Sequence, residues 1–186
     1  MAGPKVVVYG LSTEGYAIAS QMAIKGADVY IIDESTPSAI SLKAEIAKTY
    51  PNVSSLKEDE PLLAMEPIDV AISKAQYLFF TPRIRKTGQD IKTEIHSKFK
   101  DAVTSLKKNS SVIFTLATGF GGNNENISLL EHVTGLQAGK NISYFYYPLE
   151  DLNQQPKIIG SFNGKEDSVL SDLLTTGKKE KNFVAI

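Results

Sequence analysis

A glycine-rich turn between an apolar strand and a helix constrains the fold of this chain more than any other feature. Residues 5–9 form an apolar, β-branched run, and the turn GLSTEG follows at once at residues 10–15. A helical pattern over residues 16–25 leads to a second apolar run, residues 29–32, which ends in Asp33. This order of strand, turn, helix, strand and acid is typical of a βαβ unit that binds a dinucleotide.

The turn and the acid predict different contacts to such a ligand. The start of the helix exposes N–H groups that can hold a pyrophosphate. Asp33 stands 23 residues after Gly10 and can accept hydrogen bonds from an adenosine ribose, which favours NAD over NADP. Two residues oppose this interpretation. Ser12 replaces the central glycine of the usual motif, so its Cβ restricts close approach, and Glu14 places a negative charge beside the expected pyrophosphate.

Strand and helix signals alternate along the rest of the chain, which predicts a doubly wound parallel α/β sheet. We expect one Rossmann-like domain over residues 1–176, with strand order 3-2-1-4-5-6, and a C-terminal tail at residues 177–186. After Asp33 we expect a helix that Pro51 stops and a weak third strand at residues 52–56. The remaining signals predict strands at 77–80, 112–116, 142–147 and 157–160, and helices at 88–107, 125–134 and 165–176.

Loops at the carboxyl ends of the strands are the expected ligand site, because ligands of open parallel sheets bind there. The basic segment 81–86 and the glycine-rich segment 117–124 follow two predicted strands. Each segment also has a purely structural interpretation, as an ordinary turn or a solvated loop. The sequence assigns no catalytic residue, and the predicted cofactor-binding residues are Gly10, Leu11, Ser12, Thr13, Glu14, Gly15, Asp33, Thr81, Pro82 and Thr118.

Composition excludes several classes of function. The net charge of −1 over 186 residues gives no reason to expect binding to nucleic acid or to a membrane surface. No apolar stretch approaches the ~20 residues of a membrane span, and the N-terminus lacks a signal peptide, so we expect a cytoplasmic protein. The absence of cysteine excludes disulfides, thiolate metal sites and cysteine nucleophiles. With His96 and His132 as the only histidines, no metal site is predicted.

Taken together, the motifs resemble the N-terminal NAD-binding domain of the UDP-glucose/GDP-mannose dehydrogenases, which oxidise nucleotide sugars with NAD. The resemblance covers residues 5–164 and depends on the order and spacing of several short segments. These are the turn 10–15, Ile32-Asp33-Glu34, Phe80-Thr81-Pro82, Ala117-Thr118 with Gly121, Tyr147-Pro148-Leu149-Glu150 and Pro156-Lys157-Ile158-Ile159-Gly160.

The resemblance implies NAD as cofactor, a nucleotide sugar or another small molecule as ligand, and a domain that lacks the family's central and C-terminal domains. The family's four-electron oxidation uses a cysteine thiolate, which this chain does not have, and the family glutamate falls on Leu149. Three functions therefore remain open. The protein is an oxidoreductase component that works with a separate catalytic subunit, a small oxidoreductase with its site at a homodimer interface, or a non-enzymatic scaffold or regulator that kept the fold and lost the cofactor.

Overall fold

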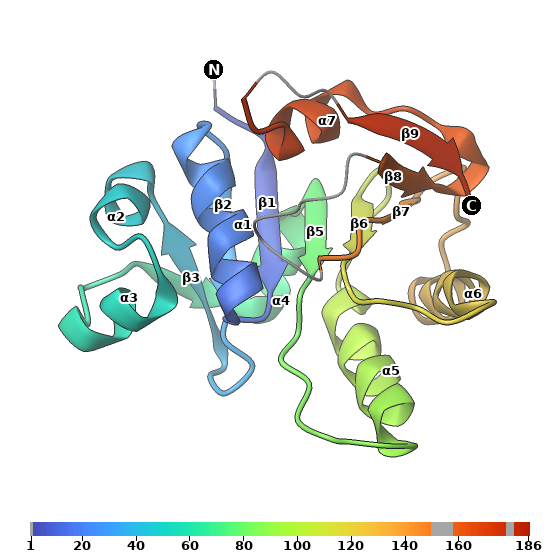
Figure 1. Ribbon diagram of the computed structural model, residues 1–186, viewed down its shortest axis with the longest axis horizontal. Helices are drawn as coiled ribbons and strands as arrows, with labels where there is room; N and C mark the ends of the chain where they lie inside the picture. Colours follow the sequence, from blue (N-terminus) through green and yellow to red (C-terminus); the bar gives the residue numbers. More distant parts are fainter. Residues whose placement is uncertain (1, 150–157, 178–180) are drawn as a thin grey trace.

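The computed structural model describes residues 2–149, 158–177 and 181–186, which form one α/β domain around a nine-stranded sheet (Figure 1). The strands lie in the order β4-β3-β2-β1-β5-β6-β7-β8-β9. Along the chain the elements are β1 (Lys5–Tyr9), α1 (Thr13–Ile24), β2 (Asp28–Ile32), β3 (Ser38–Leu42), α2 (Ala44–Thr49), α3 (Val53–Asp59), β4 (Met65–Pro67), α4 (Ile68–Lys74), β5 (Tyr77–Phe80), α5 (Asp90–Val103), β6 (Ser111–Phe114), α6 (Gly122–Thr134), β7 (Ser143–Tyr146), β8 (Ile158–Ser161), the 3-10 turn η2 (Phe162–Gly164), α7 (Ser168–Leu174) and β9 (Asn182–Ala185).

The centre of the sheet is parallel and its flanks are mixed. Strands β2, β1, β5, β6 and β7 run in one direction, with Val7 paired to Tyr30 on one side and to Leu78 on the other. β3 is antiparallel to β2, β4 to β3, and β8 to β7, whereas β9 is parallel to β8. The β3-β2-β1-β5-β6-β7 part of the sheet confirms the predicted doubly wound order, although its third strand has a different position and direction.

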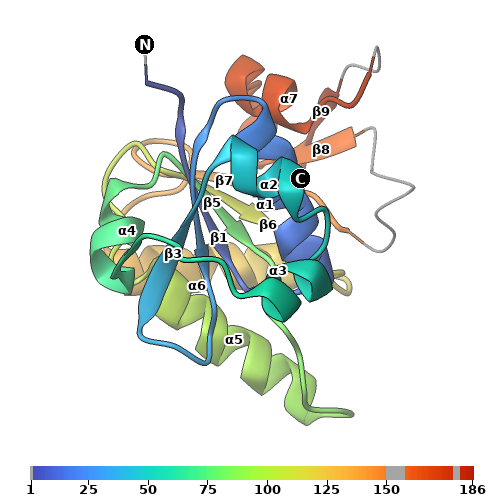
Figure 2. The same ribbon diagram turned by 90° about the vertical axis from the view of Figure 1, so that its left-hand side faces the viewer.

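Helices cover both faces of the sheet (Figures 1 and 2). Residues alternate along β1, so Val6 and Val8 join the hydrophobic core under α1, α2 and α7, while Val7 and Tyr9 join the core under α4, α5 and α6. This alternation, with both faces buried, is why the central strands read as continuous apolar runs. Because β1, β5 and β6 run in the same direction, the loops after them lie together at one edge of the sheet.

The segment after Asp33 differs from the expected helix and third strand. The backbone N–H of Thr36 donates to the Asp33 carbonyl at 3.0 Å, and this turn sends the chain back along β2 as β3. The expected helix is reduced to the short α2. The expected strand at residues 52–56 is instead the first part of α3, because the Asn52 side chain accepts a hydrogen bond from the Ser55 backbone at 2.9 Å and caps that helix.

The segment expected to be a C-terminal tail also differs in the part that the structure describes. Residues 182–185 form β9 and pair with β8. The Phe183 ring lies 5.8 Å from the ring of Phe145 on β7, so an apolar contact accompanies the strand pairing. A strand at the sheet edge gains its stability from such partners and not from its own sequence. Within the described residues, no helix has the length and apolar character needed to cross a membrane.

Candidate functional site

Two glycines of the 10–15 turn are fixed by close packing. The Gly10 N–H donates to the Ile32 carbonyl at 3.0 Å, which ties the turn to the end of β2. Gly10 has a φ of +120°, and a Cβ there would lie 2.1 Å from the Thr81 carbonyl oxygen at the end of β5. A Cβ on Gly15 would lie 2.1 Å from the Gly10 carbonyl oxygen. The ends of β1 and β5 and the start of α1 therefore meet with no room for a side chain.

Ser12 fills the position that a glycine holds in the usual dinucleotide motif. Its hydroxyl accepts a hydrogen bond from the Gly15 N–H at 3.0 Å and so caps α1. The same hydroxyl donates to the Thr81 carbonyl at 3.2 Å, and the Thr81 hydroxyl donates to the Tyr9 carbonyl at 3.2 Å. Ser12 is buried, so these bonds connect the turn to β5 inside the protein.

The start of α1 keeps part of its capacity to bind an anion. The backbone N–H groups of Thr13 and Glu14 have no hydrogen-bond acceptor among the described residues, whereas the N–H of Gly15 is taken by Ser12. Unpaired N–H groups at the positive end of a 12-residue helix attract negative charge. The Glu14 carboxylate lies in the same first turn, and its negative charge repels an anion that binds there.

A cavity of about 310 Å³ lies beside this turn, at the carboxyl ends of β1, β5 and β6. The Arg83 guanidinium donates to the Leu11 carbonyl at 2.9 Å and so spans the turn from the β5 side. Arg83 belongs to the basic segment 81–86, which the sequence predicts at this edge of the sheet. The lining residues are Ser12, Glu14, Thr81, Pro82, Arg83, Ile84, Thr115, Leu116 and Leu149, of which the first four are predicted cofactor-binding residues.

Asp33 lies directly after β2, in the turn that leads to β3. Its Oδ1 accepts hydrogen bonds from the Ser35 backbone N–H at 3.0 Å and from the Ser35 hydroxyl at 2.7 Å. Burial acts to raise the pKa of Asp33, but these two hydrogen bonds and the nearby charges of Lys57 and Arg83 outweigh it and hold the pKa below its usual value. Asp33 is therefore ionised at neutral pH, and no described donor bonds its Oδ2.

Glu34 belongs to an ionic network that sequence reasoning missed. Its carboxylate accepts a hydrogen bond from the Arg83 backbone N–H at 3.2 Å and from the Lys98 amine at 2.8 Å. Lys98 also pairs with Glu94 at 3.1 Å, one turn earlier on α5. The Glu94 and Lys98 spacing of four residues was a usable signal, but nothing in the sequence points from that helix to Glu34. The network joins the loop after β2 to the loop after β5.

Thr118 lies apart from the other predicted site residues. Its backbone N–H donates to the Tyr146 hydroxyl at 3.1 Å, and it lines a second cavity of about 600 Å³ between the starts of α5 and α6. His96 lines that cavity too, with its Nε2 4.0 Å from a Glu125 oxygen. The described residues hold no cluster of three metal-binding side chains. Two parts of the family resemblance, at Glu150 and at residues 156–157, lie outside the described residues.

The Ser12 cap gives a first testable prediction. Replacing Ser12 with alanine removes the acceptor of the Gly15 N–H, and we expect a loss of about 1 kcal/mol in the free energy of unfolding. Replacing Ser12 with glycine restores the residue of the usual motif, and we expect a loss of only a few tenths of a kcal/mol. Urea unfolding followed by circular dichroism measures both. A Ser12→Ala variant as stable as the unaltered protein would show that the hydroxyl cap does not stabilise α1.

No protein-family model matches the sequence, and no curated protein matches it either. Solved structures do. GDP-mannose dehydrogenase from Pseudomonas aeruginosa matches with a TM-score of 0.65 and 14% identity over 97% of this chain and 46% of that chain. NDP-N-acetyl-D-galactosaminuronic acid dehydrogenase from Methanosarcina mazei matches with a TM-score of 0.61 and 13% identity over 98% of this chain and 44% of that chain.

A reductive aminase from Aspergillus terreus, solved with NADPH and ethyl levulinate, matches with a TM-score of 0.56 and 13% identity over 99% of this chain and 55% of that chain. The chain thus spans less than half of each of the two dehydrogenase chains. At such low identities the likeness concerns the fold, and it agrees with the sheet order and with the resemblance found in the motifs. The chain has the Rossmann-like fold of dehydrogenases and reductases.

Proposed function

We propose that the protein binds NAD at the carboxyl edge of its sheet. The observation that supports this most is the pair of unpaired N–H groups of Thr13 and Glu14 beside the 310 Å³ cavity, where a pyrophosphate is placed in a dinucleotide-binding fold. The ionised Asp33 supplies the ribose acceptor at the end of β2. A carboxylate there repels the 2′-phosphate of NADP, so NAD is the preferred cofactor.

The proposed role is that of an oxidoreductase component related to nucleotide-sugar dehydrogenases. NAD supplies hydride transfer when it is bound, and the chain supplies the binding edge. The chain has no cysteine for a covalent aldehyde intermediate. In this proposal, substrate contacts and the exclusion of water come from a separate catalytic subunit or from a second copy of this chain.

A second candidate function is a scaffold or regulator that has lost the cofactor. The specific observation in its favour is Ser12, whose hydroxyl already occupies the Gly15 N–H that a pyrophosphate can use. The Glu14 carboxylate adds repulsion at the same place. Both features belong to the turn itself. The first candidate predicts that the unaltered protein binds NAD, and the second predicts that it does not.

Calorimetric titration with NAD, NADH and NADP separates the two candidates. We expect NAD to bind more tightly than NADP, and Asp33→Asn to weaken NAD binding about tenfold, which corresponds to about 1.4 kcal/mol. Asp101→Asn, a change of an exposed acid on α5, is the control and leaves affinity unchanged. An Asp33→Asn variant that binds NAD as well as the unaltered protein contradicts the proposed ribose contact.

No detectable binding of any dinucleotide at millimolar concentration favours the scaffold. In that case Ser12→Gly combined with Glu14→Gln is the informative variant, because it removes the competing cap and the repelling charge together. Binding by this variant alone shows that the cofactor site is blocked by those two residues.

A further inference from the structure

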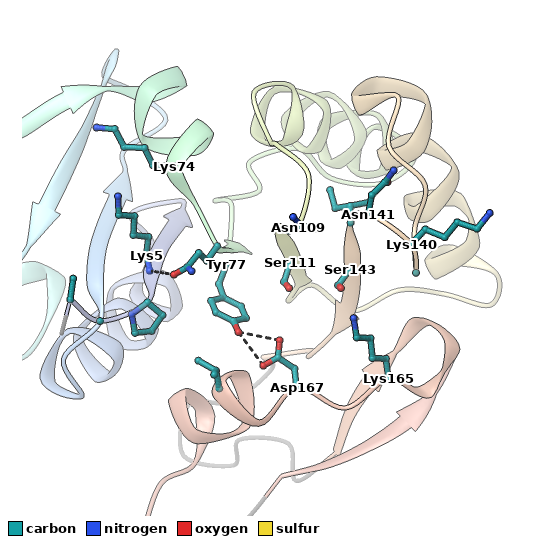
Figure 3. A pocket seen from close by; sticks show the side chains of 17 residues that line it. Lys5, Lys74, Tyr77, Asn109, Ser111, Lys140, Asn141, Ser143, Lys165 and Asp167 are labelled. Carbon is teal, nitrogen blue, oxygen red and sulfur yellow. Dashed lines mark hydrogen bonds between the residues drawn. The ribbon is translucent and has the colours of Figure 1, made fainter.

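A cavity of about 750 Å³ lies at the amino ends of β5, β6 and β7, at the opposite edge of the sheet from the candidate cofactor site (Figure 3). It is bounded by the chain before β1, the loops before β6 and β7, and the segment that leads into α7. A volume of this size suits a small organic ligand, for which pockets of about 300 to 1,000 Å³ are usual. The candidate cofactor site uses none of the residues that line this cavity.

The floor of the cavity carries two hydroxyls that lack protein partners. Tyr77, Ser111 and Ser143 are the first residues of three adjacent parallel strands and are in register, so their side chains lie on one face of the sheet. Ser111 is 7% exposed and Ser143 is partly buried, and neither hydroxyl makes a hydrogen bond to another described residue. Both residues line the cavity, so their hydroxyls are available to bond a ligand.

A fixed carboxylate faces these hydroxyls. Both oxygens of Asp167 accept the Tyr77 hydroxyl proton, at 3.0 and 3.1 Å, and Oδ1 also accepts a hydrogen bond from the Leu170 N–H at 2.9 Å. In Figure 3 the side chains of Ser111, Ser143, Lys165 and Asp167 converge on the middle of the cavity. A carboxylate, an amine and two hydroxyls provide both acceptors and donors, which is what a ligand with several hydroxyls needs.

The residues that line the cavity carry more positive than negative charge, although the chain as a whole carries −1. Lys5, Lys74, Lys140 and Lys165 line it, and Asp167 is the only carboxylate among the described lining residues. Lys74 pairs with Glu66 at 2.8 Å, while the other three amines have no described carboxylate within 4.0 Å. In Figure 3 the Lys165 amine points toward the middle of the cavity, whereas the amines of Lys5, Lys74 and Lys140 lie at its margin and point away from it.

We propose that this cavity binds a phosphorylated sugar, with its phosphate on the Lys165 amine and its hydroxyls on Ser111, Ser143 and Asp167. A phosphate is a strong acceptor for lysine amines. The serine hydroxyls and the fixed carboxylate are the reason for proposing a ligand that carries hydroxyls as well as a charge. This site is separate from the proposed NAD site and does not depend on it.

Titration of the ¹⁵N-labelled protein with ribose 5-phosphate, followed by ¹H–¹⁵N NMR, tests the proposal. We expect saturable shifts of the Ser111, Ser143 and Lys165 amides, and weaker binding of ribose alone and of inorganic phosphate alone. Lys165→Gln is expected to lower the affinity about tenfold, and Ser111→Ala several-fold. Lys48→Gln, a change of an exposed lysine on α2, is the matched control and leaves the affinity unchanged.

Three results overturn the proposal. One is the absence of saturable shifts at about 10 mM ribose 5-phosphate, a concentration that fills even a site of millimolar Kd. Another is a set of shifts confined to residues 10–15, which places the phosphate at the start of α1. The third is equal binding of ribose and ribose 5-phosphate. Asp33→Asn is expected to bind ribose 5-phosphate as the unaltered protein does, so failure at one site is distinguishable from failure at the other.

Discussion

Replacing Gly10 with alanine is expected to lower the free energy of unfolding by about 3 kcal/mol or more. The backbone at Gly10 has a φ of +120°, which residues with a Cβ rarely adopt. The added Cβ would also lie 2.1 Å from the Thr81 carbonyl oxygen and 2.9 Å from the Pro82 Cα. These are backbone atoms, so no change of rotamer relieves the contact, and β1 and β5 must separate at their carboxyl ends.

Urea unfolding followed by far-UV circular dichroism measures this loss. Gly119→Ala is the matched control, because no atom within 4 Å would meet its Cβ and its φ lies outside the positive range. We expect the control to change stability by less than about 0.5 kcal/mol. Gly10→Ala protein that unfolds at the same urea concentration as the control would show that the turn does not pack against the end of β5.

The parts of the fold that follow from local patterns were predicted well. Val6, Val7 and Val8 form a β-branched run whose two faces are both buried, and the helix after them ends at Ile24, two residues before the predicted stop at Gly26. The central strands after them repeat this pattern, so their positions and their order were predictable. Local periodicity is informative where a segment is buried on both sides and flanked by clear turn signals.

The edges of the sheet were predicted poorly, and the reason is physical. Residues 38–42 alternate between buried and partly buried positions, but they form a strand because the Asp33 turn returns them to β2. β9 likewise depends on β8 and on the contact of Phe183 with Phe145. Strand pairing at an edge is decided by distant partners, which a single sequence does not reveal.

The candidate site shows the same difference between local signals and contacts from distant residues. The sequence predicted the glycine turn and Asp33 as cofactor-binding residues because their spacing is local. The Thr81 carbonyl that Ser12 bonds is 69 residues away, and the Lys98 that Glu34 bonds is 64 residues away. Likewise, Ser111 and Ser143 become neighbours only through the register of β6 and β7. The sequence placed the turn 10–15 and the segment 81–86 at one edge, and residues of both line the same cavity, whereas Thr118 lines a different cavity and the side-chain contacts needed the structure.

Replacing Phe99 with alanine is expected to cost about 3 to 5 kcal/mol of unfolding free energy. Phe99 projects from α5 into the core beneath it and is fully buried. Its ring lies 5.0 Å from the ring of Phe80 and 5.4 Å from that of Phe114, in edge-to-face geometry with interplanar angles of 71° and 77°. The variant loses the buried ring, both aromatic contacts and the packing around the resulting cavity.

Phe120→Ala is the control for this variant, because Phe120 has the same side chain in the exposed loop before α6 and no core contact to lose. Urea unfolding of the two variants should differ by at least about 3 kcal/mol. A small loss for Phe99→Ala would mean that α5 does not pack on the sheet as the structure shows. The proposed NAD contacts lie on α1 and in the turn after β2, so Phe99→Ala protein that is still folded should retain its NAD affinity. A loss of affinity in folded protein would instead show that α5, through Lys98 and Glu34, positions the cofactor edge.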